Sequence, residues 1–230
     1  MKRLFQILFT SLAWTLPVVA EDWTSALSHM PLPREVTSLS RSNCAEVVLG
    51  AFQSNATVKA LIFMPGATDE LYFFKRVKVQ ITNSQPTLLD AVVALTNQSP
   101  LRVAFRPPFL LLHSDEDVLE LDARIKHPAT VEKLKQTKLF PRLVVQDRDW
   151  DFLLTAFGQK LSVELRPAFR SPDSWHFYRH TFAAYDSTSW DILQAAAYAG
   201  KTRFTVQKDL VEFEPDPRIG VLPRLESFPR

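Results

Sequence analysis

The sequence predicts an α+β protein built from tandem small β-α-β-β modules, with helices packed on mixed sheets. Two stretches, the first copy (Gln85 to Asp115) and the second copy (Asp186 to Asp216), align without a gap at an offset of 101 residues. In both copies an apolar stripe with helical spacing precedes two segments that fit strands. A shorter middle copy lies between them, and such internal repetition is typical of modular proteins.

The first copy begins after a predicted strand at residues 76–81, where apolar and polar residues alternate. Pro86 suits the first turn of a helix that runs to residues 97–100. Alternation at residues 101–106 and an apolar run at 109–112 predict two further strands. Because Pro107 and Pro108 cannot form a type I′ turn, we expect a wide connection or loosely paired strands here.

The second copy repeats this order, with a strand through Tyr178, His180 and Phe182 and a helix that Asp186 or Ser187 is expected to cap. The middle copy has a strand at 143–145, a helix after Asp149 and a strand at 161–165. Trp150 and Trp190 hold equivalent positions at two helix starts, which favours a packing role. Residues 43–52 and 59–64 predict a further helix and strand, as a degenerate fourth unit or an added edge. Five aligned pairs of the two full copies are identical: Thr87 and Thr188, Asp90 and Asp191, Ala94 and Ala195, Arg102 and Arg203, Asp115 and Asp216.

The helix sequence Thr-Leu-Leu-Asp-Ala-Val-Val-Ala-Leu at 87–95, the polar break at 97–100 and Leu-Arg-Val-Ala-Phe at 101–105 resemble a known bacterial module. The pattern is similar to the secretin and TonB short N-terminal domain and to the C-terminal module of FecR-type regulators. The resemblance implies a periplasmic fold that binds other proteins and has no catalytic residues. It departs from the family at Ser99-Pro100, where a glycine such as Gly200 is usual.

The N-terminal residues predict export. Lys2 and Arg3 precede an apolar run that ends in small residues near Ala20, which is typical of a cleaved signal peptide, so the protein is expected to be periplasmic or secreted. Cleavage would leave 25 of the 27 basic residues against 25 acidic ones. This balance argues against nucleic acid as a partner, and no integral membrane span is expected after cleavage. Cys44 is the single cysteine, so no internal disulfide is expected.

The composition divides the chain into six expected segments. They are a signal peptide (1–20), a linker (21–42), a first module with an N-terminal extension (43–117), a partial middle module (118–170), a last module (171–216) and an extended proline-rich tail (217–230).

No motif predicts catalysis, a metal site or a cofactor. Asp147, Asp149 and Asp151 start like an EF-hand loop, but the required glycine and the final carboxylate are missing. His176 and His180 stand four residues apart on a predicted strand, without the further ligands of a zinc site. Nucleophile elbows and phosphate-binding glycine loops are also missing.

The candidate binding residues lie on the strand that opens the last module. Exposed aromatic side chains at an unpaired strand attract partners, which favours Trp175 and Phe177, together with His176, Tyr178 and His180. We therefore expect a non-catalytic interaction or scaffolding protein of the bacterial envelope that uses a strand edge or a helix-sheet groove. The alternatives are a periplasmic protein that binds a glycan or small ligand, and an unrecognised hydrolase.

Overall fold

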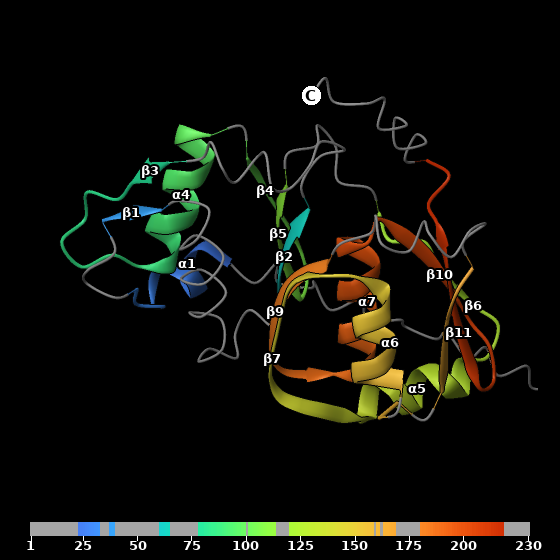
Figure 1. The fold of residues 1–230 in the computed structure, drawn as a ribbon. Coiled ribbons are helices and arrows are strands. Elements are labelled where there is room, and N and C mark those ends of the chain that lie inside the picture. Colours follow the sequence, from blue (N-terminus) through green and yellow to red (C-terminus); the bar gives the residue numbers. More distant parts are fainter. Residues whose placement is uncertain are drawn as a thin grey trace, which may run out of the picture.

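The computed structural model describes residues 23–32, 37–39, 60–64, 78–99, 101–113, 120–158, 160–161, 163–168 and 180–218. These residues form four layers in which helices and sheets alternate (Figure 1). The first layer holds α1 (Trp23–Ser28) and α4 (Leu88–Gln98), and the second is a five-stranded sheet. The third holds α6 (Trp150–Gly158) and α7 (Ser189–Ala199), with α5 (Pro128–Gln136) beside them, and the fourth is a four-stranded sheet. The expected α+β class with mixed sheets is confirmed.

The five-stranded sheet has the order β4-β5-β2-β9-β7. Its strands are β4 (Arg102–Arg106), β5 (Phe109–His113), β2 (Ala60–Met64), β9 (His180–Thr188) and β7 (Lys138–Arg148). Successive side chains of a strand point to opposite faces of the sheet. Because Phe109 to Leu112 of β5 are all apolar and buried, both faces of the sheet are apolar at this strand. Leu110 and Leu112 pack in the core that contains α4, whereas Phe109 and Leu111 pack in the core that contains α7.

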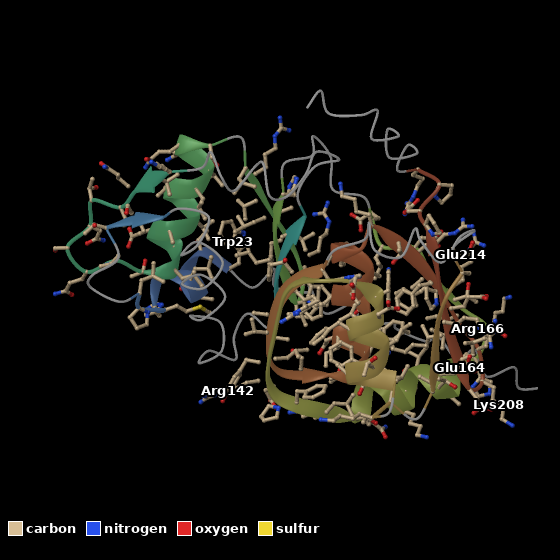
Figure 2. All side chains as sticks on the ribbon, in the orientation of Figure 1. Trp23, Arg142, Glu164, Arg166, Lys208 and Glu214 are labelled. Carbon is tan, nitrogen blue, oxygen red and sulfur yellow. The ribbon has the colours of Figure 1, made fainter. Side chains whose placement is uncertain are left out.

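The four-stranded sheet has the order β6-β10-β11-β8. Its strands are β6 (Ala123–Ile125), β10 (Thr202–Val206), β11 (Leu210–Pro215) and β8 (Glu164–Pro167). The inner face buries Phe204 and Phe213 against the two helices of the third layer. The outer face carries charged side chains, and Figure 2 shows Glu164, Arg166 and Glu214 on this outer side. This sheet is therefore apolar on one face and polar on the other.

The five-stranded sheet contains strands of all three copies, and the core around α7 contains residues of all three as well. The strands β7 and β9 belong to the five-stranded sheet, whereas the strands that follow α6 and α7 belong to the four-stranded sheet. Trp150 at the start of α6 is 1% exposed and its ring lies 4.7 Å from that of Phe213. Trp190 packs edge-on against Phe204 with 5.5 Å between the ring centroids. The packing role predicted for both tryptophans is confirmed.

Reciprocal caps start the two helices that the repeat relates. Helices α4 and α7 both have 11 residues, and each begins 101 residues from the other. The Thr87 hydroxyl accepts from the Asp90 N–H, and the Asp90 carboxylate accepts from the Thr87 N–H. Thr188 and Asp191 repeat this capping box at α7. The prediction that Asp186 or Ser187 caps this helix was therefore wrong. At α6, Asp149 accepts from the Phe152 N–H at 3.1 Å, as expected for a cap.

Several local expectations were wrong. Of the strand expected at 76–81, the described residues 78–81 contain β3 (Val79–Gln80), which pairs with β1 (Ser38–Leu39) in a sheet of its own, and residues 76 and 77 lie outside the described part. The segment expected to be a linker or a partly ordered lead-in contains α1, whose Leu27 is buried with Met30 in the core around α4. Strand β2 is no added edge, since it lies between β5 and β9.

The connection between β4 and β5 is tighter than expected. Arg106 pairs directly with Phe109, so Pro107 and Pro108 form a two-residue turn. The peptide bond between these prolines is cis, as in turns that carry proline at their third position. The expectation of a wide connection considered the type I′ turn alone and was wrong for that reason.

Candidate partner-binding edge

Two hairpins of the structure share one register at the offset of 101 residues. In the first hairpin (β4 and β5) Arg102 pairs with His113, and in the second hairpin (β10 and β11) Arg203 pairs with Glu214. The positions that face the preceding helix correspond as well: Val103, Phe105, Leu110 and Leu112 pack with α4, while Phe204, Val206, Val211 and Phe213 pack with α7. The repeated positions therefore form equivalent helix-on-hairpin packings.

A third strand also occupies an equivalent place in both sheets. β2 lies parallel to β5 with Ala60 opposite Phe109, and β8 lies parallel to β11 with Glu164 opposite Leu210. Phe109 and Leu210 are themselves related by the offset of 101 residues. Three adjacent strands of one sheet thus match three adjacent strands of the other in order, direction and register.

The fourth strand is where the two sheets differ. In the four-stranded sheet, β6 lies parallel to β10 and extends the sheet by one strand beyond β10. The Phe204 N–H donates to the Asp122 carbonyl at 3.1 Å, and the Lys126 N–H donates to the Val206 carbonyl at 2.9 Å. On β4 the equivalent residues are Val103 and Phe105. Among the residues that the structure describes, no strand continues the sheet beyond β4.

The outward backbone groups of β4 follow from this shared register. In a hairpin, alternate residues of each strand direct their N–H and C=O groups toward the partner strand. Phe204 and Val206 direct theirs toward β6, so Val103 and Phe105 direct theirs to the side of β4 that faces away from β5. The Arg106 side chain donates to the Phe105 carbonyl at 3.4 Å, which is consistent with this direction.

The other strands that end a sheet in the described part of the chain have features that hinder strand addition. The N–H groups of Glu164 and Ala168 donate to the carbonyls of Asp209, just before β11, and of Phe213 on β11. The main-chain groups of Leu165 and Pro167 on β8 therefore face outward, and proline has no N–H to donate. On β7, Pro141, the exposed Arg142 and two register irregularities interrupt the edge (Figure 2). β6 has three residues. β4 has five residues, with outward main-chain groups at Val103 and Phe105, of which the Phe105 carbonyl accepts from Arg106.

A cluster of charges positions β6 against β10. The Arg218 guanidinium donates to the Asp216 carboxylate and to the Glu120 carbonyl, the latter at 2.8 Å, and so connects the end of the second copy to the segment before β6. The hydrogen bond from Arg218 holds the pKa of Asp216 below its usual value. Burial, with the nearby Glu120 carboxylate, raises the pKa of Tyr198 at the same place. These contacts connect the segment before β6 to the end of β11, next to the edge of β10 on which β6 lies.

The sequences of the two hairpins differ on the face that points away from the preceding helix. Phe109 and Leu111 of the first hairpin are buried by the third layer of the fold. Their equivalents in the second hairpin are Leu210 and Glu212, and the ion pair from Arg203 to Glu214 at 2.7 Å lies on the same outer face. The hairpin whose second face is covered is apolar there, whereas the outer hairpin is charged.

Of the five site residues predicted from the sequence, the described part of the chain contains His180 alone. Trp175, His176, Phe177 and Tyr178 are outside the described residues. His180 opens β9 and is 0% exposed, with its Nδ1 at 3.0 Å from the Arg148 carbonyl and its ring against Trp150 at 4.6 Å. Its burial removes His180 from any surface that a partner could contact, because the strand enters the core at this residue.

The β4 edge was missed as a site, although the repeat contained a signal for it. Arg102 and Arg203 are identical across the two copies, yet a sequence alignment cannot tell which hairpin edge is already occupied. Within the described ranges no three His, Cys, Asp or Glu side chains gather in a way that could hold a metal ion. None of the helices described has the length and hydropathy needed to span a membrane. No protein-family model, curated protein or solved structure matches this chain.

Proposed function

We propose that this protein is an exported, non-catalytic interaction protein of the bacterial cell envelope, which binds a partner protein by adding one of its strands to β4. The observation that carries the proposal is the difference between two equivalent edges. β10 pairs with β6, whereas the equivalent edge of β4 ends the described part of its sheet. The envelope location rests on the export signal expected at residues 1–20 and on the resemblance of the repeats to periplasmic interaction modules.

Strand addition fits the chemistry of this edge. Main-chain hydrogen bonds supply affinity in this mode of recognition, and side-chain contacts at alternate positions supply specificity. Val103 and Phe105 offer the main-chain groups, while their half-buried side chains border the core around α4. A strand added here would extend both the hydrogen bonding and this apolar surface.

A photo-crosslinking residue at position 106, the last residue of β4, tests the proposal, with the same residue at the exposed position 166 on β8 as the matched control. In the native envelope, position 106 should crosslink one partner protein and position 166 should not. The purified partner should then bind Val103→Pro about tenfold more weakly than the unmodified protein, because the variant lacks one outward N–H. The contacts of β4 with β5 should survive, since proline is tolerated at a sheet edge. Equal affinity of both proteins for the partner would overturn the proposal.

A further inference from the structure

The chain contains its own example of a strand bound at this type of edge. On β10, Ala123 lies opposite Phe204, and Ile125 lies opposite Val206. The equivalent positions on β4 are Val103 and Phe105, so β6 provides a template for the direction and register of a strand on β4. That strand would run parallel to β4.

The residue before β6 supplies a charge. Asp122 precedes Ala123, so the register of β6 on β10 places it beside Arg203, and its carboxylate also pairs with Arg124 at 3.8 Å. The position of β4 equivalent to Arg203 is Arg102, which is exposed. A ligand strand in the same register would therefore place its residue before the first apolar contact beside a guanidinium, where a carboxylate is favoured.

The next positions of the ligand follow from what borders the edge. Residues opposite Val103 and Phe105 would share the face that packs toward α4, where apolar side chains line the core. The position between them would lie beside Ala104, on the other face of the sheet. The expected ligand pattern is an acidic residue, a small apolar residue, a variable residue and an apolar residue, as in Asp122 to Ile125.

A second copy of the chain fits the edge poorly. Antiparallel pairing of two β4 strands around a two-fold axis would place Arg102 of one copy opposite Arg106 of the other. A parallel pair would bring like arginines together as well. Directly opposed like charges destabilise strand pairs, so self-association at β4 is disfavoured relative to an acidic strand.

We propose that the β4 edge recognises an extended segment of a partner protein in which an acidic residue precedes the apolar contacts, bound parallel to β4 in the register that β6 adopts on β10. This inference rests on the proposed function and specifies the chemistry of the partner.

The probe is a capped synthetic peptide with the sequence of residues 120–126, titrated into the full chain while backbone amide resonances are followed by NMR. The amides of Val103 and Phe105 should shift, with a dissociation constant below about 1 mM. A peptide with lysine in place of the aspartate should bind at least about fivefold more weakly. Arg102→Glu should reverse this preference, whereas Arg166→Glu, the same change at an exposed arginine of β8, should preserve it.

Each other outcome overturns the inference. These outcomes are no binding at about 1 mM, equal binding of the two peptides, shifts confined to Phe204 and Val206, and peptide-independent self-association through β4. If the crosslinked partner is sensitive to Val103→Pro while the peptide does not bind, the acidic chemistry is wrong and strand addition stands. If the partner is insensitive to Val103→Pro, strand addition itself is wrong.

Discussion

Thr188 and Asp191 each satisfy a backbone N–H of the other at the start of α7, with N···O distances of 3.0 and 3.1 Å. Thr87 and Asp90 do the same at α4, 101 residues earlier. Two of the identical pairs of the repeat are therefore helix caps. The conformity of the two copies at these positions has a local physical cause, since a helix start leaves N–H groups that need acceptors.

Replacing the capping threonines should destabilise the fold by similar amounts. Thr188→Ala and Thr87→Ala each leave one helix N–H without its side-chain acceptor, which costs about 1 kcal/mol in the free energy of unfolding. Urea denaturation should show a lower midpoint with an unchanged slope. Thr96→Ala is the matched control, because its exposed hydroxyl bonds to a carbonyl within α4. The capping account would be wrong if all three variants unfolded at the same urea concentration.

Gly200 should not tolerate a methyl group. A Cβ at this position would lie 2.6 Å from His180 Nε2 and 3.0 Å from the Ala196 carbonyl oxygen. His180 is fixed by its contacts with Trp150 and the Arg148 carbonyl, so Gly200→Ala should destabilise the protein by about 1–3 kcal/mol. Gly158→Ala is the control, since a Cβ there meets no atom within 4 Å and alanine favours the helix. Equal unfolding midpoints for the two variants would contradict this packing.

Asp216 should contribute to stability in a pH-dependent way. Its pKa is lowered mainly by the hydrogen bond from Arg218, so the ionised form is favoured in the folded state. The contribution is complete above the unfolded value near 3.8 and is lost as pH falls through the lower folded pKa. The difference in unfolding free energy between the unmodified protein and Asp216→Asn should therefore shrink below about pH 4. Arg218→Gln should remove most of this pH dependence, and a difference that persists undiminished at about pH 2 would contradict it.

The sequence predicted the local elements better than their assembly. The stripe from Leu88 to Leu95 and its equivalent in α7 indicated both helices, because helical spacing is a local property of the chain. The cap of α7 was misplaced by one or two residues, since Asp186 and Ser187 are also common capping residue types. Strand β6 escaped prediction because Ala123, Arg124 and Ile125 are too few to establish a period.

Strand pairing and the candidate site depend on contacts between distant segments. No local pattern in the sequence predicts that β2 lies between β5 and β9, or that α6 and α7 each connect a strand of one sheet to a strand of the other. The apolar Phe109 and charged Glu214 were visible in the sequence. Phe109 belongs to a hairpin whose second face is covered by helices, whereas Glu214 belongs to a hairpin whose second face is charged. Within the described part of the chain, the edge of β4 differs from the equivalent edge of β10 in having no further strand beside it.

Amide hydrogen exchange at Val103 and Phe204, measured by NMR on the protein alone, tests the central claim most directly. These residues hold equivalent places on β4 and β10, and the Phe204 N–H donates to Asp122 on β6. We predict that the Val103 amide exchanges at least about 100-fold faster than the Phe204 amide, because its N–H faces away from β5, where no strand of the described residues lies. Equally slow exchange of both amides would mean that the β4 edge is already occupied, and would contradict the account.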